Sequence, residues 1–333
     1  MSLALLFGIA AQFRAMHGKK LIERLIGSLS NRVGVLYSTL IVSAALSPLV
    51  LNDVVILFLT PVLAEHCRTH PSDAVPLIVA EVTFTNVGST LTPFGNPQNI
   101  LLWENSGIGA LRFVKGTAPY VLLSGILCAL ALLVYRKRTS KFTVNWSSDG
   151  IIVPAIYLMV LSATIFLLSV LGVENTVSIG IAFVIGFLLN IRHIGGFLRE
   201  FDVRSLALIY CLIVATTTAS FFLGSHIERY TELIADGIQP SSAILMALIS
   251  NVISNVPATQ LVLSSTHVAA SGAPLVAVEA GLAGNLTPVG SLANILALTI
   301  SRSYGLKLKK IVVVQALIGL VSYIPVFLIH FFS

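Results

Sequence analysis

The chain has 333 residues, of which 56% are hydrophobic and only 10% are charged, and its mean hydropathy is +0.94. Because a soluble domain carries about 25% charged residues, this composition excludes an ordinary soluble protein and predicts an all-α polytopic membrane protein. The net charge of +6 does not indicate nucleic-acid binding, since the basic residues stand in short clusters between apolar segments. Three scattered cysteines do not suggest a disulfide framework or a zinc site.

The first half of the chain alternates ordinary spans with interrupted ones. A helix needs roughly 20 apolar residues to cross the hydrocarbon core, so residues 2–16 predict a short first span and 116–135 a regular one. Residues 17–31 are basic and amphipathic, and we expect them to lie at the membrane interface. The apolar segments 33–66 and 74–104 are each interrupted by polar residues, proline or glycine.

The second half contains the same kinds of segment after a polar linker. In chain order these are the linker 136–150, the spans 151–171, 175–191 and 204–224, the interfacial stretch 225–238, the interrupted segments 241–266 and 273–300, and the final span 309–331.

The basic residues predict the orientation of the chain. If 33–66 and 241–266 are re-entrant hairpins and every other segment crosses once, 17 of the 20 basic residues fall on one face. Only Arg112, Lys115 and Arg229 fall on the other. The positive face is expected to be cytoplasmic, which places the protein in the cytoplasmic (plasma) membrane as a multi-pass protein in the lipid bilayer.

An internal repeat is the strongest pattern in the sequence. Residues 91–100 read LTPFGNPQNI and residues 286–295 read LTPVGSLANI, with six identical positions of ten at an offset of 195. Upstream, Asn52 aligns with Asn255 at an offset of 203. The matches fall on Thr, Pro, Gly and Asn, which argues against chance similarity between apolar segments. Five single crossings separate the copies, so the second is predicted to be inverted relative to the first.

The repeat defines the expected organisation of the chain. We expect inverted repeats, each with a re-entrant hairpin and a broken transmembrane helix. The first copy has no counterpart of the spans 151–171 and 175–191, so we expect an N-terminus shortened by two or three helices. The predicted units are repeat 1 at 1–135 with hairpin 33–66 and broken helix 74–104, the cytoplasmic linker 136–150, and repeat 2 at 151–333 with hairpin 241–266 and broken helix 273–300.

The four interruptions are the candidate binding site. Irregular backbone at membrane depth persists only where protein or a water-filled cavity satisfies it. Helix N-termini favour anions and free carbonyls favour sodium, while Asn and Thr provide neutral donors and acceptors. The same residues could instead serve only to tie helices together.

Three carboxylates fall inside apolar segments, and a charge at the bilayer centre costs at least about 2.5–3.5 kcal/mol. Asp53, beside Asn52 in a hairpin break, is the best candidate for a cation or proton. Glu81 and Glu279 precede the two broken motifs at non-equivalent offsets and remain candidates for either a proton site or structural pairing.

Other classes of function fit the sequence less well. Neither an HExxH motif nor a Gly-x-Ser-x-Gly elbow is present, so we do not expect an enzyme. A channel could also contain re-entrant hairpins, but two inverted copies favour alternating access. His66 and His70 have the spacing of a helical pair, yet they precede Pro71, and we expect a solvated pair rather than a metal site.

Four stretches resemble the ion transporter superfamily of arsenite permeases, citrate and divalent-anion:sodium symporters and sodium–proton antiporters. They are LNDVVILFLTPVL at 51–63, TNVGSTLTPFGNPQNILLW at 85–103, SNVISNVPATQLVLSS at 250–265 and GNLTPVGSLANILAL at 284–298. The chain looks most similar to the arsenite permease and citrate transporter-like branch. It lacks the Ser-Asn-Thr triplets of the dicarboxylate symporters, which leaves dicarboxylate specificity and sodium stoichiometry open.

The resemblance implies a site between the hairpin tips and the broken helices, and commonly a homodimer. By position it would include Asn52, Asp53, Asn96, Asn99, Asn255, Thr287, Ser291 and Asn294. The breaks themselves add Thr92, Gly95 and Gly290 to the candidate substrate- and ion-binding residues.

These observations predict a secondary active transporter for a carboxylate- or arsenite-like anion, coupled to sodium, protons or the membrane potential. A sodium–proton antiporter of the same superfamily is the alternative. We expect no cofactor and no resident metal site; sodium is a candidate coupling ion, and the partners are lipid and a small anion rather than nucleic acid.

Overall fold

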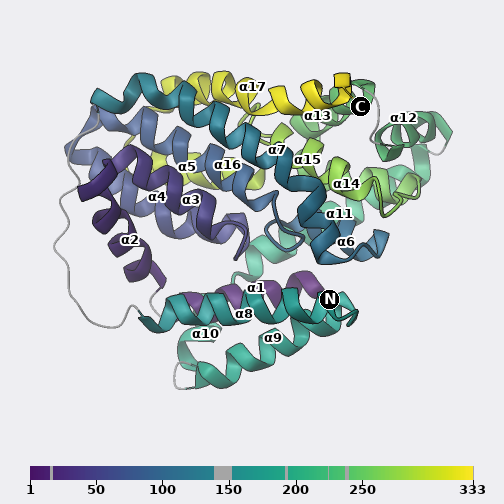
Figure 1. Cartoon of the computed structure of the whole chain (residues 1–333), viewed down its shortest axis with the longest axis horizontal. Coiled ribbons are helices and arrows are strands. Elements are labelled where there is room, and N and C mark those ends of the chain that lie inside the picture. Colours follow the sequence, from purple (N-terminus) through teal and green to yellow (C-terminus); the bar gives the residue numbers. More distant parts are fainter. Residues whose placement is uncertain (16–17, 139–151, 192–193, 224, 237–239, 333) are drawn as a thin grey trace.

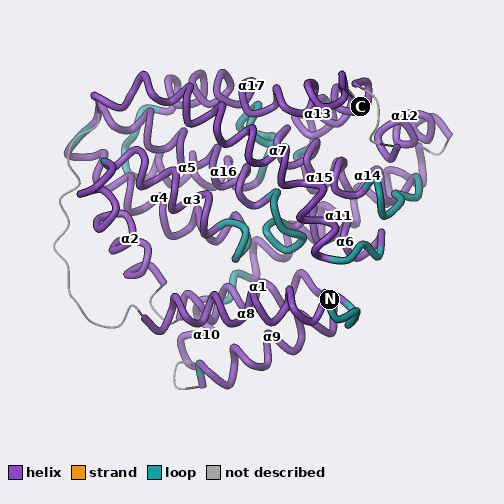
Figure 2. The backbone as a smooth tube through the Cα atoms, in the orientation of Figure 1, coloured by secondary structure: helices purple, strands orange, loops and turns teal. Residues whose placement is uncertain are grey.

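The computed structural model describes residues 1–333 except 16–17, 139–151, 192–193, 224, 237–239 and 333. In this described part every regular element is a helix (Figures 1 and 2). The first half contains α1 (Ser2–Ala15), α2 (Gly18–Val33), α3 (Val35–Leu46), α4 (Asn52–Thr69), η1 (Pro71–Asp73), α5 (Ala74–Ser89), α6 (Pro97–Ser106), α7 (Ala110–Ala131) and η2 (Leu132–Arg138). The second half contains α8 (Ile152–Val170), α9 (Asn175–Leu189), α10 (Ile194–Glu200), α11 (Val203–Leu223), α12 (Ser225–Asp236), α13 (Pro240–Ile253), α14 (Asn255–Ser265), α15 (Ala273–Ala283), α16 (Leu292–Ser303) and α17 (Leu308–Phe332). Most of the linker predicted at 136–150 lies outside the described residues.

The lengths and surfaces of the helices suit a bilayer. Among the described residues, Ala110–Tyr135 and Leu308–Leu328 are long and apolar enough to cross alone. The bent pair of helices Glu228–Ala235 and Pro240–Ile253 is a third candidate span if the two are counted as one. Other apolar helices, including α1, α8, α9 and α11, are shorter in their described parts. On α7, Leu122, Ile126 and Leu130 recur every four residues and are 54–65% exposed. An apolar stripe facing outward from a long helix is typical of contact with lipid.

Each interrupted segment forms two short helices that meet at a break. Pro48 follows the end of α3, and α4 begins at Asn52. At the corresponding place in the second half, position 251 is Asn rather than Pro, and α13 continues to Ile253. A proline cannot donate the hydrogen bond that would extend the helix, which explains the earlier end of α3. Ser254 alone separates α13 from α14, and its φ of +76° is costly for a residue with a Cβ.

Helices of the two halves pack against one another in matching pairs. In the first half α5 contacts α3, α4 and α7, and in the second half α15 contacts α13, α14 and α17. Between the halves, α4 packs against α16 as α6 packs against α14, and α5 packs against α17 as α7 packs against α15. The pairing therefore places α5 and α15, with the breaks that follow them, in the middle of the protein.

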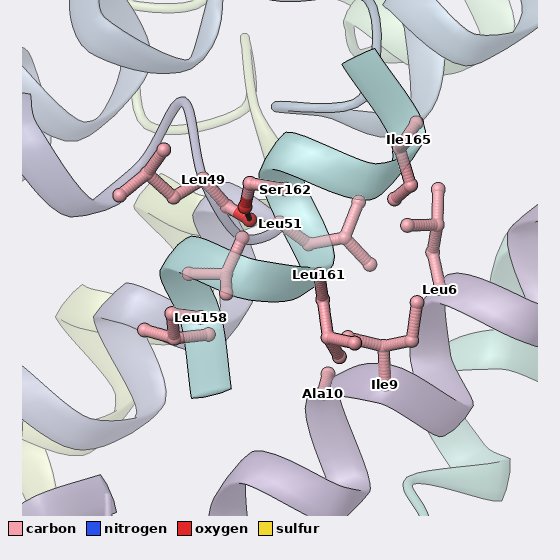
Figure 3. A pocket seen from close by; sticks show the side chains of 10 residues that line it. Leu6, Ile9, Ala10, Leu49, Leu51, Leu158, Leu161, Ser162 and Ile165 are labelled. Atoms are coloured by element: carbon pink, nitrogen blue, oxygen red, sulfur yellow. Dashed lines mark hydrogen bonds between the residues drawn. The ribbon is translucent and has the colours of Figure 1, made fainter. Parts of the chain in front are cut away.

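The helix α1 departs from this correspondence. It packs mainly against α9 and α10, and with α8 these helices form the layer at the lower edge of Figure 1. Its counterpart α11 packs against α14 instead. A small cavity of about 10 Å³ lies between α1, α8 and the Leu49–Leu51 turn that connects α3 to α4 (Figure 3). It is lined by apolar side chains, and Ser162 of α8 donates a hydrogen bond of 3.0 Å to the Leu49 carbonyl, so α8 supports the turn directly.

The prediction of a solvated histidine pair is wrong for His66. Its ring is 8% exposed and stacks on His70 with 4.6 Å between ring centroids. Its Nε2 lies 3.0 Å from the carboxylate of Asp73, which is fully buried. A buried carboxylate requires a hydrogen-bonded partner, and His66 provides it for Asp73. This contact joins the end of α4 to the η1 turn before α5.

Candidate functional site

The start of α6 is fixed by its own sequence. Asn96 stands at the N-cap, and its side chain accepts a hydrogen bond of 2.9 Å from the Asn99 backbone N–H. Pro97 follows at the first helical position, where its missing N–H costs nothing. Ser291 holds the equivalent N-cap position of α16. Both helices therefore begin inside the protein, immediately after an irregular segment.

The first residues of α4 and of α14 are each bonded to the break of their own half. The Asn52 backbone N–H donates to the Gly95 carbonyl over 2.9 Å, and the Asn255 N–H donates to the Gly290 carbonyl over 3.0 Å. These are the same two positions of the repeat. Because four backbone groups are satisfied in this way, the unwound segments can remain away from water.

Two asparagines at equivalent positions hydrogen-bond the carbonyls of the breaks. The Asn99 amide donates to the carbonyls of Ser89 and Thr92, with 2.8 Å to Thr92. The Asn294 amide donates to Gly284 and to Thr287, with 2.8 Å to Thr287. Every member of the second set lies 195 positions after its counterpart in the first.

The threonines of the two breaks bond to the α3–α4 turn and to α13. The Thr92 hydroxyl donates 2.7 Å to the Pro48 carbonyl, and the Thr287 hydroxyl donates 2.7 Å to the side-chain oxygen of Asn251. Pro48 and Asn251 are separated by the same 203 positions as Asn52 and Asn255. The sequence repeat is thus also a repeat of hydrogen bonds.

Asn86 of α5 connects the two sets. Its side-chain NH₂ donates to the side-chain oxygens of Asn285, at 3.0 Å, and Asn294, at 2.8 Å. Its side-chain oxygen accepts bonds of 3.3 Å from Asn52 and from Ser291. Asn86 is 1% exposed, and it joins the start of α4 to the start of α16. We call these five residues the asparagine network.

The structure brings together the residues predicted from the breaks. Asn52, Ser291 and Asn294 belong to the asparagine network itself. The others lie in the breaks, in the first turns of α6 and α16, or in the first turns of α4 and α14; these are Asp53, Thr92, Gly95, Asn96, Asn99, Asn255, Thr287 and Gly290. The sequence reasoning missed Asn86 and Asn285. Both stand in the stretches that resemble the superfamily, but each has a non-identical counterpart, Gly281 and Thr90, so the repeat did not mark them.

The three buried carboxylates have different surroundings. Asp53 is 4% exposed in the first turn of α4; its N–H bonds Asn52, and its Oδ2 has no hydrogen-bond partner. Glu81 accepts a bond of 2.7 Å from Thr60 of α4, and Glu279 accepts one of 2.7 Å from Ser242 of α13. Among the described hydrogen bonds of these three residues, one reaches the asparagine network, and it comes from the backbone N–H of Asp53 rather than from its carboxylate.

Gly95 provides a test of the break geometry. A Cβ at this position would lie 2.9 Å from the Ser89 carbonyl carbon and even closer to its oxygen, so backbone would have to move. We expect Gly95→Ala to lower stability by about 1–3 kcal/mol, measured as the thermal unfolding midpoint in detergent, and to reduce activity with it. Gly125→Ala in α7 is the control, because its Cβ would meet nothing nearer than 3.9 Å. Equal midpoints for the two variants would contradict the close packing at Gly95.

The comparisons with known proteins identify the family of the chain. The family described as Citrate transporter matches residues 2–279. The chain belongs to the citrate transporter family. This confirms the resemblance to the ion transporter superfamily, and with the apolar helices it identifies a multi-pass membrane protein of a transporter family.

Several relatives of the family are similar over different lengths. The uncharacterized transporter MJ0456 of Methanocaldococcus jannaschii is 29% identical over 85% of this chain and 76% of its own. The inner membrane protein YbiR of Escherichia coli is 29% identical over 77% of this chain and 66% of its own. The silicon efflux transporter LSI3 of rice is 36% identical over 29% of this chain and 20% of its own. The chain thus spans between a fifth and three quarters of the lengths of these relatives.

Proposed function

We propose that this protein is a secondary active transporter that moves a carboxylate- or arsenite-like anion across the cytoplasmic membrane by alternating access. The duplicated hydrogen bonds of the two breaks, joined through Asn86, support it most directly. Two inverted repeats, each with a re-entrant hairpin and a broken helix, account for the matched packing of the two halves. A site between repeats can open to either side as one repeat rocks against the other.

The chemistry of the breaks suits an anion accompanied by a cation. The helices α6 and α16 begin at the breaks, and their N-terminal N–H groups attract negative charge. The asparagine network is neutral, and Asp53, whose backbone N–H donates to the side-chain oxygen of Asn52, is the carboxylate residue adjoining it. A cation at Asp53 would neutralise that carboxylate, so that an anion bound nearby would not meet an uncompensated negative charge in low dielectric. Sodium or a proton is therefore the coupling ion we propose.

A sodium–proton antiporter is the second candidate, and the buried glutamates favour it. Glu81 and Glu279 are both fully buried, and each accepts a hydroxyl hydrogen bond away from the asparagine network. Buried carboxylates of this kind are typical of proton relays in transporters.

Uptake by purified protein in proteoliposomes separates these functions. A sodium or proton gradient would be imposed across the proteoliposome membrane. The substrates tested would be arsenite, silicic acid, citrate, succinate, sulfate and sodium itself. We expect gradient-driven uptake of one of the anions or oxyacids. Sodium movement against a proton gradient, with none of the others taken up, would replace the proposal with the antiporter.

A further inference from the structure

The helix α2 combines an apolar face with a basic one. Its apolar face contains Leu21, Ile22 and Ile26, which are at most 3% exposed and belong to the hydrophobic core. The helix packs against α3 and α4. A helix with charged side chains on one side and apolar side chains on the other is suited to lie along a membrane surface rather than across the bilayer.

The basic side chains follow one another along the exposed side of α2. Lys20, Arg24 and Arg32 recur at multiples of four residues, with Ser28 between the last two, and all four are exposed. Residues four apart are neighbours on the surface of a helix. None of the ion pairs found among the described residues includes Lys20, Arg24 or Arg32. We call these three residues the basic stripe.

The counterpart of α2 in the second half carries the opposite charge. With histidine counted as neutral, α2 has four basic residues and one acidic residue, a net charge of +3, whereas α12 has one basic and three acidic residues, a net charge of −2. The two helices lie at opposite ends of the molecule (Figure 1). The distribution of basic residues predicts that the end with α2 is cytoplasmic. Anionic lipids give the cytoplasmic leaflet a negative surface potential, which attracts a basic helix on that side alone.

The helix α2 is joined directly to the first arm of an interrupted segment. Gly34 alone separates α2 from α3, and its φ of +84° favours glycine. The Gly34 carbonyl accepts hydrogen bonds from the Ser38 N–H, at 3.0 Å, and from the Ser38 hydroxyl, at 2.8 Å. Any contact that holds α2 at the membrane surface therefore also fixes the start of α3, which leads to the turn before Asn52.

We infer that the basic stripe binds the phosphate headgroups of anionic phospholipids in the cytoplasmic leaflet, so that α2 anchors the start of α3 at the membrane surface. Lysine and arginine side chains are donors only, and a phosphate offers several acceptor oxygens. Because the apolar face of α2 is already buried in protein, the attraction is electrostatic and weakens as salt screens the charges. The inference holds whatever solute the protein carries.

Lipid binding by the purified full chain tests the basic stripe. The protein in neutral detergent would be titrated with phosphatidylglycerol or with phosphatidylcholine, and bound lipid would be counted by native mass spectrometry. Each basic residue near an anionic surface contributes about fivefold in affinity, so phosphatidylglycerol should be preferred by roughly a hundredfold at low salt. Glycerol phosphate has the same headgroup chemistry without acyl chains and should not compete. Equal binding of the two lipids, or equal competition by glycerol phosphate, would overturn the inference.

Variants assign the preference to α2. Replacing Lys20, Arg24 and Arg32 together with glutamine should abolish it, and Arg24→Gln alone should reduce it about fivefold. The control variant removes the same charge from exposed residues predicted on the opposite face. These residues are Arg112, Lys115 and Arg229.

Thermal unfolding provides a second measurement. Phosphatidylglycerol should raise the midpoint of the wild type and of the control variant, but not that of the variant without the basic stripe. In phosphatidylcholine alone the three proteins should unfold at the same temperature, because only exposed side chains differ. A preference that survives the loss of the basic stripe, or that is lost equally in the control variant, would remove α2 as the lipid-binding surface.

Discussion

Replacing Asn86 with alanine is expected to abolish uptake and to lower the stability of the protein. The side chain makes four hydrogen bonds, two as donor and two as acceptor, and it joins residues of both halves. Interhelical hydrogen bonds in membrane proteins contribute about 0.6 kcal/mol each on average, so the loss should be about 2–4 kcal/mol in the free energy of unfolding. The thermal midpoint in detergent and the uptake rate in proteoliposomes would measure the two effects.

The neighbouring Thr85 is the control for Asn86→Ala. Thr85 is also fully buried on α5, but its hydroxyl has no hydrogen-bond partner. Thr85→Ala should therefore leave the midpoint nearly unchanged. If Asn86→Ala retained wild-type uptake, the asparagine network would not be required for transport.

The second large effect is expected for Asp53→Asn. The substitution keeps the shape of the side chain and removes its charge. A carboxylate and a cation about 4 Å apart attract by about 4 kcal/mol at an effective dielectric constant of 20, so affinity for the coupling cation should fall roughly a thousandfold. The measurement is uptake of the identified substrate against increasing sodium and, separately, against external pH. We expect the dependence on one of these ions to disappear.

Glu81→Gln is the comparison for this experiment. Glu81 is as deeply buried as Asp53, but its hydrogen bond goes to Thr60, away from the asparagine network. An unchanged cation dependence in Glu81→Gln, with its loss in Asp53→Asn, is the expected result. The reverse pattern would assign the proton to Glu81 and favour the antiporter.

Much of this architecture could be predicted because the repeat preserves residues that control the backbone. The matches at Thr92, Gly95 and Asn99 with Thr287, Gly290 and Asn294 located the breaks. The carbonyls of both glycines and the amide nitrogens of both asparagines make equivalent hydrogen bonds in the two copies. Hydropathy identified the long helices α7 and α17, because their apolar residues extend over many turns.

The remaining features depend on differences between the copies, which a search for similarity passes over. Asn86 makes hydrogen bonds between the halves, whereas its counterpart, Gly281, has no side chain to do so. Gln98 is a buried polar residue, whereas its counterpart, Ala293, is buried and apolar. His66 follows the same rule on a local scale. Its burial depends on Asp73, and the spacing from His66 to His70 carries no information about that carboxylate.

The bonds from Asn86 also govern how the chain can be assembled. A ribosome completes α5 about 200 residues before it reaches Asn285 and Asn294, and until then the amide of Asn86 lacks the partners of its NH₂ group. A polar group without partners is unstable in hydrocarbon, so the first half is expected to stay loosely packed or hydrated during synthesis. The two halves should then fold cooperatively, and a substitution that disrupts either break is expected to destabilise the whole protein.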